Sequence, residues 1–173
     1  MEDAIARKEM SAAVLKTALA IEEFGIRFYS ELSDCVADER GRALMRSLGS
    51  DEQEHARIIK KEMERLSIRT NGSGVEPLHE YLEILPEKVF TRPKDSCLTV
   101  EDEIAALQKG IEVEINSIRM YQDASSRALD PKTMSTIEEL TRWELRHREI
   151  LEENMRTLKL GGAWYGYGPI LEG

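Results

Sequence analysis

The chain contains an internal repeat. When the sequence is aligned with itself at an offset of 92 residues, without gaps, residues 13–66 match residues 105–158 at 14 of 54 positions. Ordinary composition gives roughly one match in fifteen. Such a repeat indicates one supersecondary unit used twice. The identical pairs include Glu22/Glu114, Tyr29/Tyr121, Asp38/Asp130, Glu52/Glu144 and His55/His147.

Each copy is predicted to be a helical hairpin. Asp38 is placed to cap the second helix, Thr99 with Asp102 resembles a capping box before the third, and Asp130 followed by Pro131 opens the fourth. Apolar residues recur at the three- and four-residue steps of amphipathic helices over about 11–37, 39–66, 100–129 and 131–160.

The two hairpins need a long connection. Residues 67–99 hold three of the five prolines and only a short helical patch near Leu78 to Leu85, so they are predicted to cross the bundle from end to end. The tail, residues 161–173, is glycine-rich and aromatic and is expected to pack on the bundle or on a second subunit. The expected fold class is all-α, a single domain over residues 1–173 with the ferritin-like arrangement of two hairpins about a pseudo-twofold axis.

Composition limits the partners. The chain has 24 Lys and Arg against 33 Asp and Glu, a net charge of −9, which disfavours nucleic acid and anionic membranes and favours cations. No long apolar window and no secretory signal is evident, so we expect a cytoplasmic protein without a membrane span. Cys35 and Cys97 form no Cys-x-x-Cys motif, so neither a rubredoxin-type iron site nor a zinc finger is predicted, and both are expected to be reduced thiols.

Two Glu-x-x-His motifs carry the chemistry. Glu52 with His55, and Glu144 with His147, are spaced i, i+3, which projects a carboxylate and an imidazole from one helix face. The midpoint between Glu22 and Glu52 falls beside the predicted first turn, and the same relation holds in the second copy. Residues equally far from a turn lie level in a hairpin, so all four helices are predicted to bring a carboxylate to one layer.

A buried layer of this kind needs counter-charge, because an unpaired buried carboxylate is unfavourable or takes up a proton. Two divalent metals balance four carboxylates, and a mixed carboxylate and imidazole set favours iron, with manganese or a mixed iron–manganese pair as alternatives. Glu52 and Glu144 are predicted to bridge the two ions. The predicted metal ligands are Glu22, Glu52, His55, Glu114, Glu144 and His147.

Other polar and aromatic residues have less specific interpretations. Tyr29 and Tyr121 lie seven residues after Glu22 and Glu114, near the same helix face. Each phenol is expected either to hydrogen-bond a ligand carboxylate or to be a core tyrosine with a satisfied hydroxyl. Trp143 is predicted to be a core residue rather than a redox relay. The residues interpreted as solvated are His79, Glu23, Glu54 and Glu112.

At residues 20–29, 51–56, 110–121 and 144–147 the sequence resembles the ferritin-like di-iron carboxylate superfamily, and within it the rubrerythrin-like proteins. The resemblance spans about residues 11–160 and implies a carboxylate-bridged di-iron site. Rubrerythrins proper add a small Cys₄-iron domain that supplies electrons, and this sequence encodes none. The resemblance therefore implies an external electron donor, such as rubredoxin or a similar small redox protein, and a homodimer or larger homo-oligomer.

Two positions depart from the family patterns. Rubrerythrin bundles carry an additional glutamate three residues after the third-helix ligand, where this chain has Ser117 and its repeat mate is Gly25. The remaining four glutamates and two histidines are similar to the set in bacterioferritin, but Gln53 stands where bacterioferritins have their haem-binding methionine. This ligand set is symmetric, so the two irons are expected to be nearly equivalent.

We therefore expect a rubrerythrin-like di-iron oxidoreductase that reacts with hydrogen peroxide or dioxygen. The alternative is a ferritin-like ferroxidase for iron storage or iron detoxification, with an acidic surface that gathers Fe²⁺. A helical interaction module with a vestigial site is the third class, and it requires six matched residues to persist without use.

Overall fold

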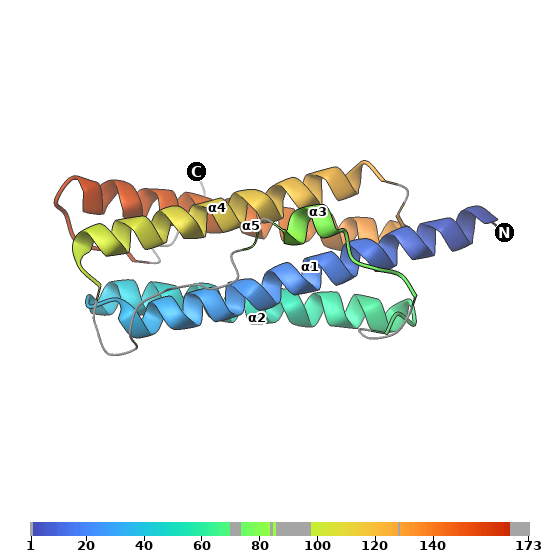
Figure 1. Ribbon diagram of the computed structural model, residues 1–173, viewed down its shortest axis with the longest axis horizontal. Coiled ribbons are helices and arrows are strands. Elements are labelled where there is room, and N and C mark those ends of the chain that lie inside the picture. Colours follow the sequence, from blue (N-terminus) through green and yellow to red (C-terminus); the bar gives the residue numbers. More distant parts are fainter. Residues whose placement is uncertain (1, 70–73, 84, 86–97, 128, 167–173) are drawn as a thin grey trace.

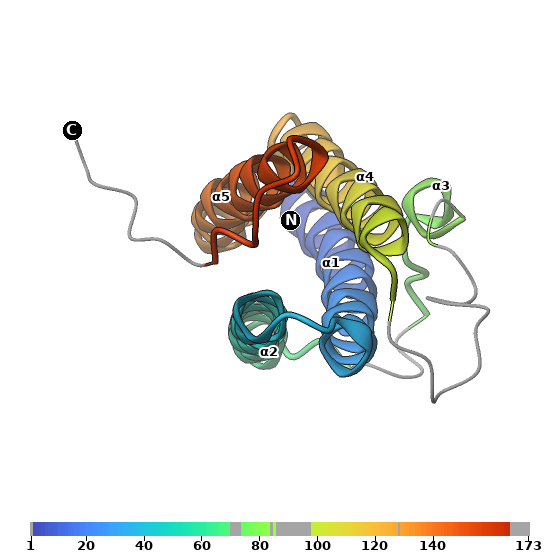
Figure 2. The same ribbon diagram turned by 90° about the vertical axis from the view of Figure 1, so that its left-hand side faces the viewer.

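In the computed structural model the chain is described over residues 2–69, 74–83, 85, 98–127 and 129–166. It is all-α, and α1 with α2, and α4 with α5, form two antiparallel hairpins that lie side by side (Figure 1). The end-on view in Figure 2 shows the four long helices around a common axis, with α3 beside α4. The predicted fold class is confirmed. The helices are α1 Glu2–Cys35, α2 Glu39–Arg65, α3 His79–Leu82, α4 Val100–Ser125 and α5 Pro131–Lys159.

The three predicted helix starts are confirmed. Asp38 accepts hydrogen bonds from the backbone of Arg40 and Gly41 at 2.8 and 3.2 Å. Thr99 and Asp102 form a reciprocal capping box at the start of α4. Asp130 caps α5 with Pro131 in the first turn. These side chains satisfy amide donors that a helix start leaves unpaired, and they fix where each hairpin turns.

Two helix ends differ from the prediction. α1 begins at Glu2 rather than at about residue 11. Residues 3–9 include strong helix formers, but they are exposed and have no apolar period, so the sequence pattern did not indicate these first turns. α4 ends at Ser125 rather than at about residue 129. The hydroxyls of Ser125 and Ser126 donate to carbonyl oxygens three residues earlier, each at 2.7 Å, and such bonds compete with the next helical turn.

The connector and the tail are attached to the bundle where they are described. Tyr81 of α3 is buried and donates to Asp123 of α4 at 2.6 Å. Trp164 of the tail is buried and donates from Nε1 to Glu103 at 3.0 Å. A Cβ at Gly41 would come within 2.7 Å of the Trp164 ring, so glycine permits this contact. The predictions for residues 70–73, 84, 86–97 with Cys97, and 167–173 lie outside the described residues.

The apolar core is divided into two clusters along the bundle axis. All four long helices contribute to both clusters. Between them, each helix carries buried glutamate, and α2 and α5 also carry buried histidine. A polar layer therefore lies in the middle of an otherwise apolar core. Representative residues are Leu15, Ile59, Met120 and Ile137 in one cluster, and Phe28, Leu48, Leu107 and Leu151 in the other.

Candidate metal centre

Six titratable side chains converge in the polar layer. Each is at most 3% exposed, and their ligand atoms form two groups in which all atoms lie within 4.8 Å of one another. The two groups share a pair of residues, Glu52 and Glu144. One group is Glu22, Glu52, His55 and Glu144, and the other is Glu52, Glu114, Glu144 and His147.

The shared carboxylates face both histidines. Glu52 places Oε2 3.3 Å from His55 Nδ1 and Oε1 3.2 Å from His147 Nδ1. Glu144 places Oε1 3.0 Å from His55 Nδ1 and Oε2 3.6 Å from His147 Nδ1. Each of these two residues therefore directs one oxygen to each imidazole. The imidazole rings are nearly parallel, with centroids 5.4 Å apart.

The other two carboxylates belong to one group each. Glu22 Oε2 lies 3.3 Å from His55 Nδ1, and Glu114 belongs to the group of His147. Tyr29 donates its hydroxyl to Glu114 Oε1, and Tyr121 donates to Glu22 Oε1. Both tyrosines are fully buried. Each phenol thus reaches across to the carboxylate of the opposite hairpin.

Burial and charge divide the carboxylates into two kinds. Burial raises the pKa of Glu22 and of Glu114 well above the usual range, and the charge of Glu144 raises both further. Burial also opposes ionisation of Glu52 and Glu144. Hydrogen bonds outweigh it, however, and hold the pKa of both shared carboxyls below the usual range. Burial and neighbouring charge thus favour the protonated form of Glu22 and Glu114, whereas hydrogen bonds favour the ionised form of Glu52 and Glu144.

The pKa values of both histidines are raised, whereas burial alone lowers the pKa of an imidazole. Burial lowers the pKa of His55, but hydrogen bonds to Glu144, Glu22 and Glu52 outweigh it and raise the pKa to about 12. Burial lowers the pKa of His147 as well, and contacts with carboxylates outweigh it. The carboxylates around each imidazole therefore oppose the effect of burial on its pKa.

The donor set fits a pair of divalent ions. Four buried atoms of the cluster form no well-aligned hydrogen bond with the described residues, namely His55 Nε2, Glu144 Oε1 and both ring nitrogens of His147, although buried polar atoms are usually paired. Oxygen and imidazole donors without thiolate suit iron or manganese. A Cβ at Gly25 would lie 3.2 Å from the Glu52 carboxyl carbon, so glycine leaves room for this carboxylate. Ser117, the repeat equivalent of Gly25, is not among the clustered residues, and its hydroxyl donates to the backbone oxygen of Val113 at 3.1 Å.

The contacts outside the cluster are less symmetric than the cluster itself. Trp143 is 38% exposed, so the prediction of a core residue is wrong. It lies on α5 beside the bundle surface, and its ring contacts His55 edge-on with centroids 5.6 Å apart. Asp51 lies 3.4 Å from His147 Nε2 and was not among the predicted site residues. The 92-residue offset pairs Asp51 with Trp143, and this difference between the copies was the available signal.

The residues interpreted as solvated are exposed. Glu54 accepts from Arg57 at 2.6 Å, and Glu23 pairs with Lys60 at 3.2 Å. His79 is exposed in α3, and Glu112 is exposed on α4. None of these four residues belongs to either ligand group.

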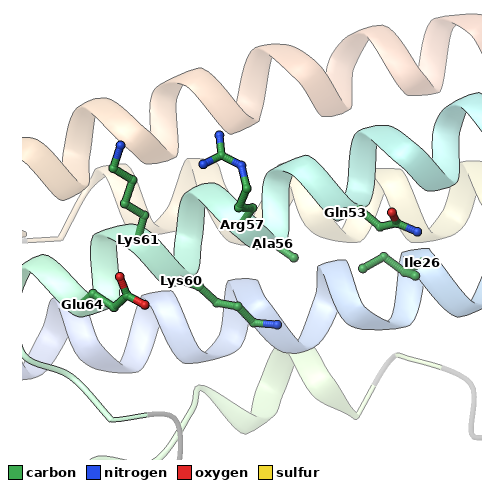
Figure 3. Close-up of a pocket in the computed structure, with 7 residues that line it drawn as sticks. All are labelled: Ile26, Gln53, Ala56, Arg57, Lys60, Lys61 and Glu64. Carbon is green, nitrogen blue, oxygen red and sulfur yellow. The ribbon is translucent and has the colours of Figure 1, made fainter.

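A surface groove of about 650 Å³ lies over α1 and α2. Figure 3 shows that its lining comes mainly from α2, with Ile26 contributed by α1. Two of its cations, Arg57 and Lys60, already pair with Glu54 and Glu23. None of the six clustered residues lines the groove. Within the part of the chain that is described, no helix is both long and apolar enough to cross a membrane.

A family model described as rubrerythrin matches residues 13–155. Among solved structures, a hypothetical protein from Pyrococcus furiosus is 16% identical with a TM-score of 0.70, over 89% of this chain and 93% of that one. A bacterioferritin-related protein from Bacteroides fragilis, described as a dodecameric thioferritin, is 16% identical with a TM-score of 0.67, over 89% of each chain.

A two-domain protein from Anabaena variabilis that contains a ferritin-like domain is 14% identical with a TM-score of 0.66. The match covers 92% of this chain and 39% of that one. No curated protein is significantly similar in sequence. At these identities the structural matches establish only the ferritin-like fold. The residues matched by the family model, 13–155, include the whole polar layer.

Proposed function

The chain belongs to the rubrerythrin family, and we propose that it is a di-iron oxidoreductase that reduces hydrogen peroxide or dioxygen. One observation carries this proposal: Glu52 and Glu144 each direct one carboxylate oxygen to His55 and the other to His147. Two carboxylates in this arrangement can bridge two ions. Glu22 and His55 would complete one ion's ligands, and Glu114 and His147 the other's.

When bound, two ferrous ions would supply the two electrons that convert hydrogen peroxide to two water molecules, or dioxygen to hydrogen peroxide. Both reductions also consume two protons. Burial and the charges of nearby carboxylates raise the pKa of Tyr29 and Tyr121 well above the usual phenol range, so both remain hydrogen-bond donors. They would hold Glu114 and Glu22 in place, while the apolar clusters on either side limit access of water.

Repeated turnover needs electrons returned to the site after each reduction. We propose that an external one-electron donor supplies them, such as rubredoxin or a similar small redox protein. We further propose that the physiological metal is iron, because the donors are oxygen and imidazole, and that the protein acts as a homo-oligomer.

The test is metal analysis followed by rapid mixing. Protein purified without added metal is expected to carry about two iron ions per chain, and one zinc per chain would contradict the proposal. No further carboxylate joins the described ligand groups near Ser117, so we expect little selectivity between oxidants. Anaerobic reduced protein should be oxidised by both, with peroxide favoured by less than about 100-fold, or roughly 3 kcal/mol.

Iron storage is the second candidate. It is favoured by the structural similarity to the Bacteroides fragilis protein, described as a dodecameric thioferritin, and by the net charge of −9. A storage protein needs a closed shell, whereas a peroxidase does not. Oxidation by dioxygen with accumulation of a large ferric core, in an assembly of shell size by light scattering, would select storage over the oxidoreductase.

A further inference from the structure

The repeat places two different residues at one position outside the cluster. Asp51 precedes Glu52, and Trp143 precedes Glu144 at the equivalent position 92 residues later. Each faces the histidine of the opposite hairpin. Asp51 Oδ2 lies 3.4 Å from His147 Nε2, whereas the Trp143 ring packs against the His55 ring with planes at 68°.

The two imidazoles therefore differ at their outer nitrogens. Nε2 of His147 has a carboxylate within ion-pair distance. Neither Nε2 atom has a hydrogen-bond partner among the described residues, so the difference between the two histidines lies in the Asp51 carboxylate beside His147 and the Trp143 ring beside His55. In both cases Nδ1 is the nitrogen that faces the shared carboxylates, so Nε2 is the atom left for an outer partner.

An outer carboxylate affects how well a histidine binds metal. A carboxylate near the outer N–H fixes the ring and makes the inner nitrogen a stronger donor, and loss of such a partner typically lowers metal affinity 10- to 100-fold. An indole ring packed against the histidine restricts its motion but provides no acceptor oxygen. The expected asymmetry thus arises from the residues around the ligands, although the ligand set itself is symmetric.

We propose that the two metal positions have unequal affinities, with the His147 position binding the first ion tightly and the His55 position binding the second ion more weakly. This inference rests on the proposed dinuclear site. The ion held by His55 would then be the exchangeable one, and Trp143, which is 38% exposed, packs against that histidine. Asp51 and Trp143 are positioning residues that act through the two histidines.

The test is an anaerobic titration of metal-free protein with Co²⁺. Calorimetry and the visible absorbance of the bound ion monitor the binding. The wild type is expected to take up two equivalents in two steps whose affinities differ at least tenfold. Asp51→Asn should weaken the tight step by about tenfold and leave the weak step unchanged. Trp143→Asp supplies the missing carboxylate and should tighten the weak step by about tenfold.

Matched controls separate this effect from general disruption. Trp143→Phe keeps an aromatic ring and adds no carboxylate, so both steps should stay as in the wild type. Glu54→Gln removes an exposed carboxylate next to His55 that pairs with Arg57 and should also have no effect. The side chain of Asp51 is 26% exposed, so neither the Asp51 nor the Trp143 substitution opens a core cavity, and thermal unfolding checks this for each variant.

Three outcomes would overturn the inference while leaving the dinuclear site intact. They are two equivalents bound with indistinguishable affinity in the wild type, no response of the tight step to Asp51→Asn, and the same response to Trp143→Phe as to Trp143→Asp. Binding of a single equivalent, or of none, would instead contradict the dinuclear site itself.

Discussion

Gly25 lies on α1 next to the cluster, and its replacement by alanine is expected to separate protein stability from metal affinity. Glycine within a helix is less stable than alanine by about 0.5–1 kcal/mol. A Cβ at this position would lie 3.2 Å from both Cγ and Cδ of Glu52. Glu52 would have to move by roughly a few tenths of an ångström, comparable with the ±0.2 Å tolerance of a metal–ligand distance.

We therefore expect Gly25→Ala to change the free energy of unfolding of the metal-free protein by no more than about 1 kcal/mol. Its metal affinity should fall by about tenfold, or about 1.4 kcal/mol. Gly49→Ala is the matched control, since its Cβ would be an ordinary 3.4 Å from Tyr29 Cβ. Calorimetric titration with Co²⁺ and thermal unfolding measure the two quantities. Affinity within twofold of wild type in Gly25→Ala, or an equal loss in Gly49→Ala, would refute the reasoning.

Three further predictions concern the cluster as a whole. Glu52→Ala and Glu144→Ala should lower bound metal per chain far more than the exposed control Glu54→Ala, measured by elemental analysis; equal losses would contradict shared ligation. Metal at about 100 times its Kd should raise the free energy of unfolding by about 2.7 kcal/mol per site, so equal melting temperatures with and without metal would contradict convergent ligation. The His55 pKa of about 12 means that metal must displace a proton at pH 7. Affinity should therefore rise from pH 6 to pH 8, by about tenfold per pH unit for each proton displaced, and calorimetry in buffers of different ionisation enthalpy would detect proton release; none would contradict the assignment.

The polar layer could be predicted because several local signals agree. The positions of Asp38 and Asp130 fix the turns, and equal distances from a turn place Glu22 level with Glu52. The i, i+3 spacing then brings His55 to the same face. Each step uses only helix geometry and needs no knowledge of how the hairpins pack. The same reasoning explains why the fold class was accessible from the sequence.

Contacts between the hairpins were harder to predict. Trp143 lies three residues after Leu140, within the apolar period of α5, but periodicity does not distinguish a core position from a partly exposed one, and Trp143 is 38% exposed. Asp51 is one of 33 acidic residues. The repeat search selected pairs of identical residues, whereas the equivalent of Asp51 in the second copy is a tryptophan. The start of α1 was missed because residues 3–9 are exposed in the described chain and therefore show no apolar period.

The cross-hairpin hydrogen bonds link the positions of the cluster's carboxyls to the packing of the two hairpins. The hairpins pack mainly within themselves and less against each other, while Tyr29 of the first hairpin bonds Glu114 of the second and Tyr121 bonds Glu22 in return. An ordinary intramolecular hydrogen bond contributes about 0.5–1.5 kcal/mol to stability, so these two bonds add to the packing between the hairpins. The same tyrosines and carboxylates thus hold the two hairpins in register and place the donor atoms of the cluster.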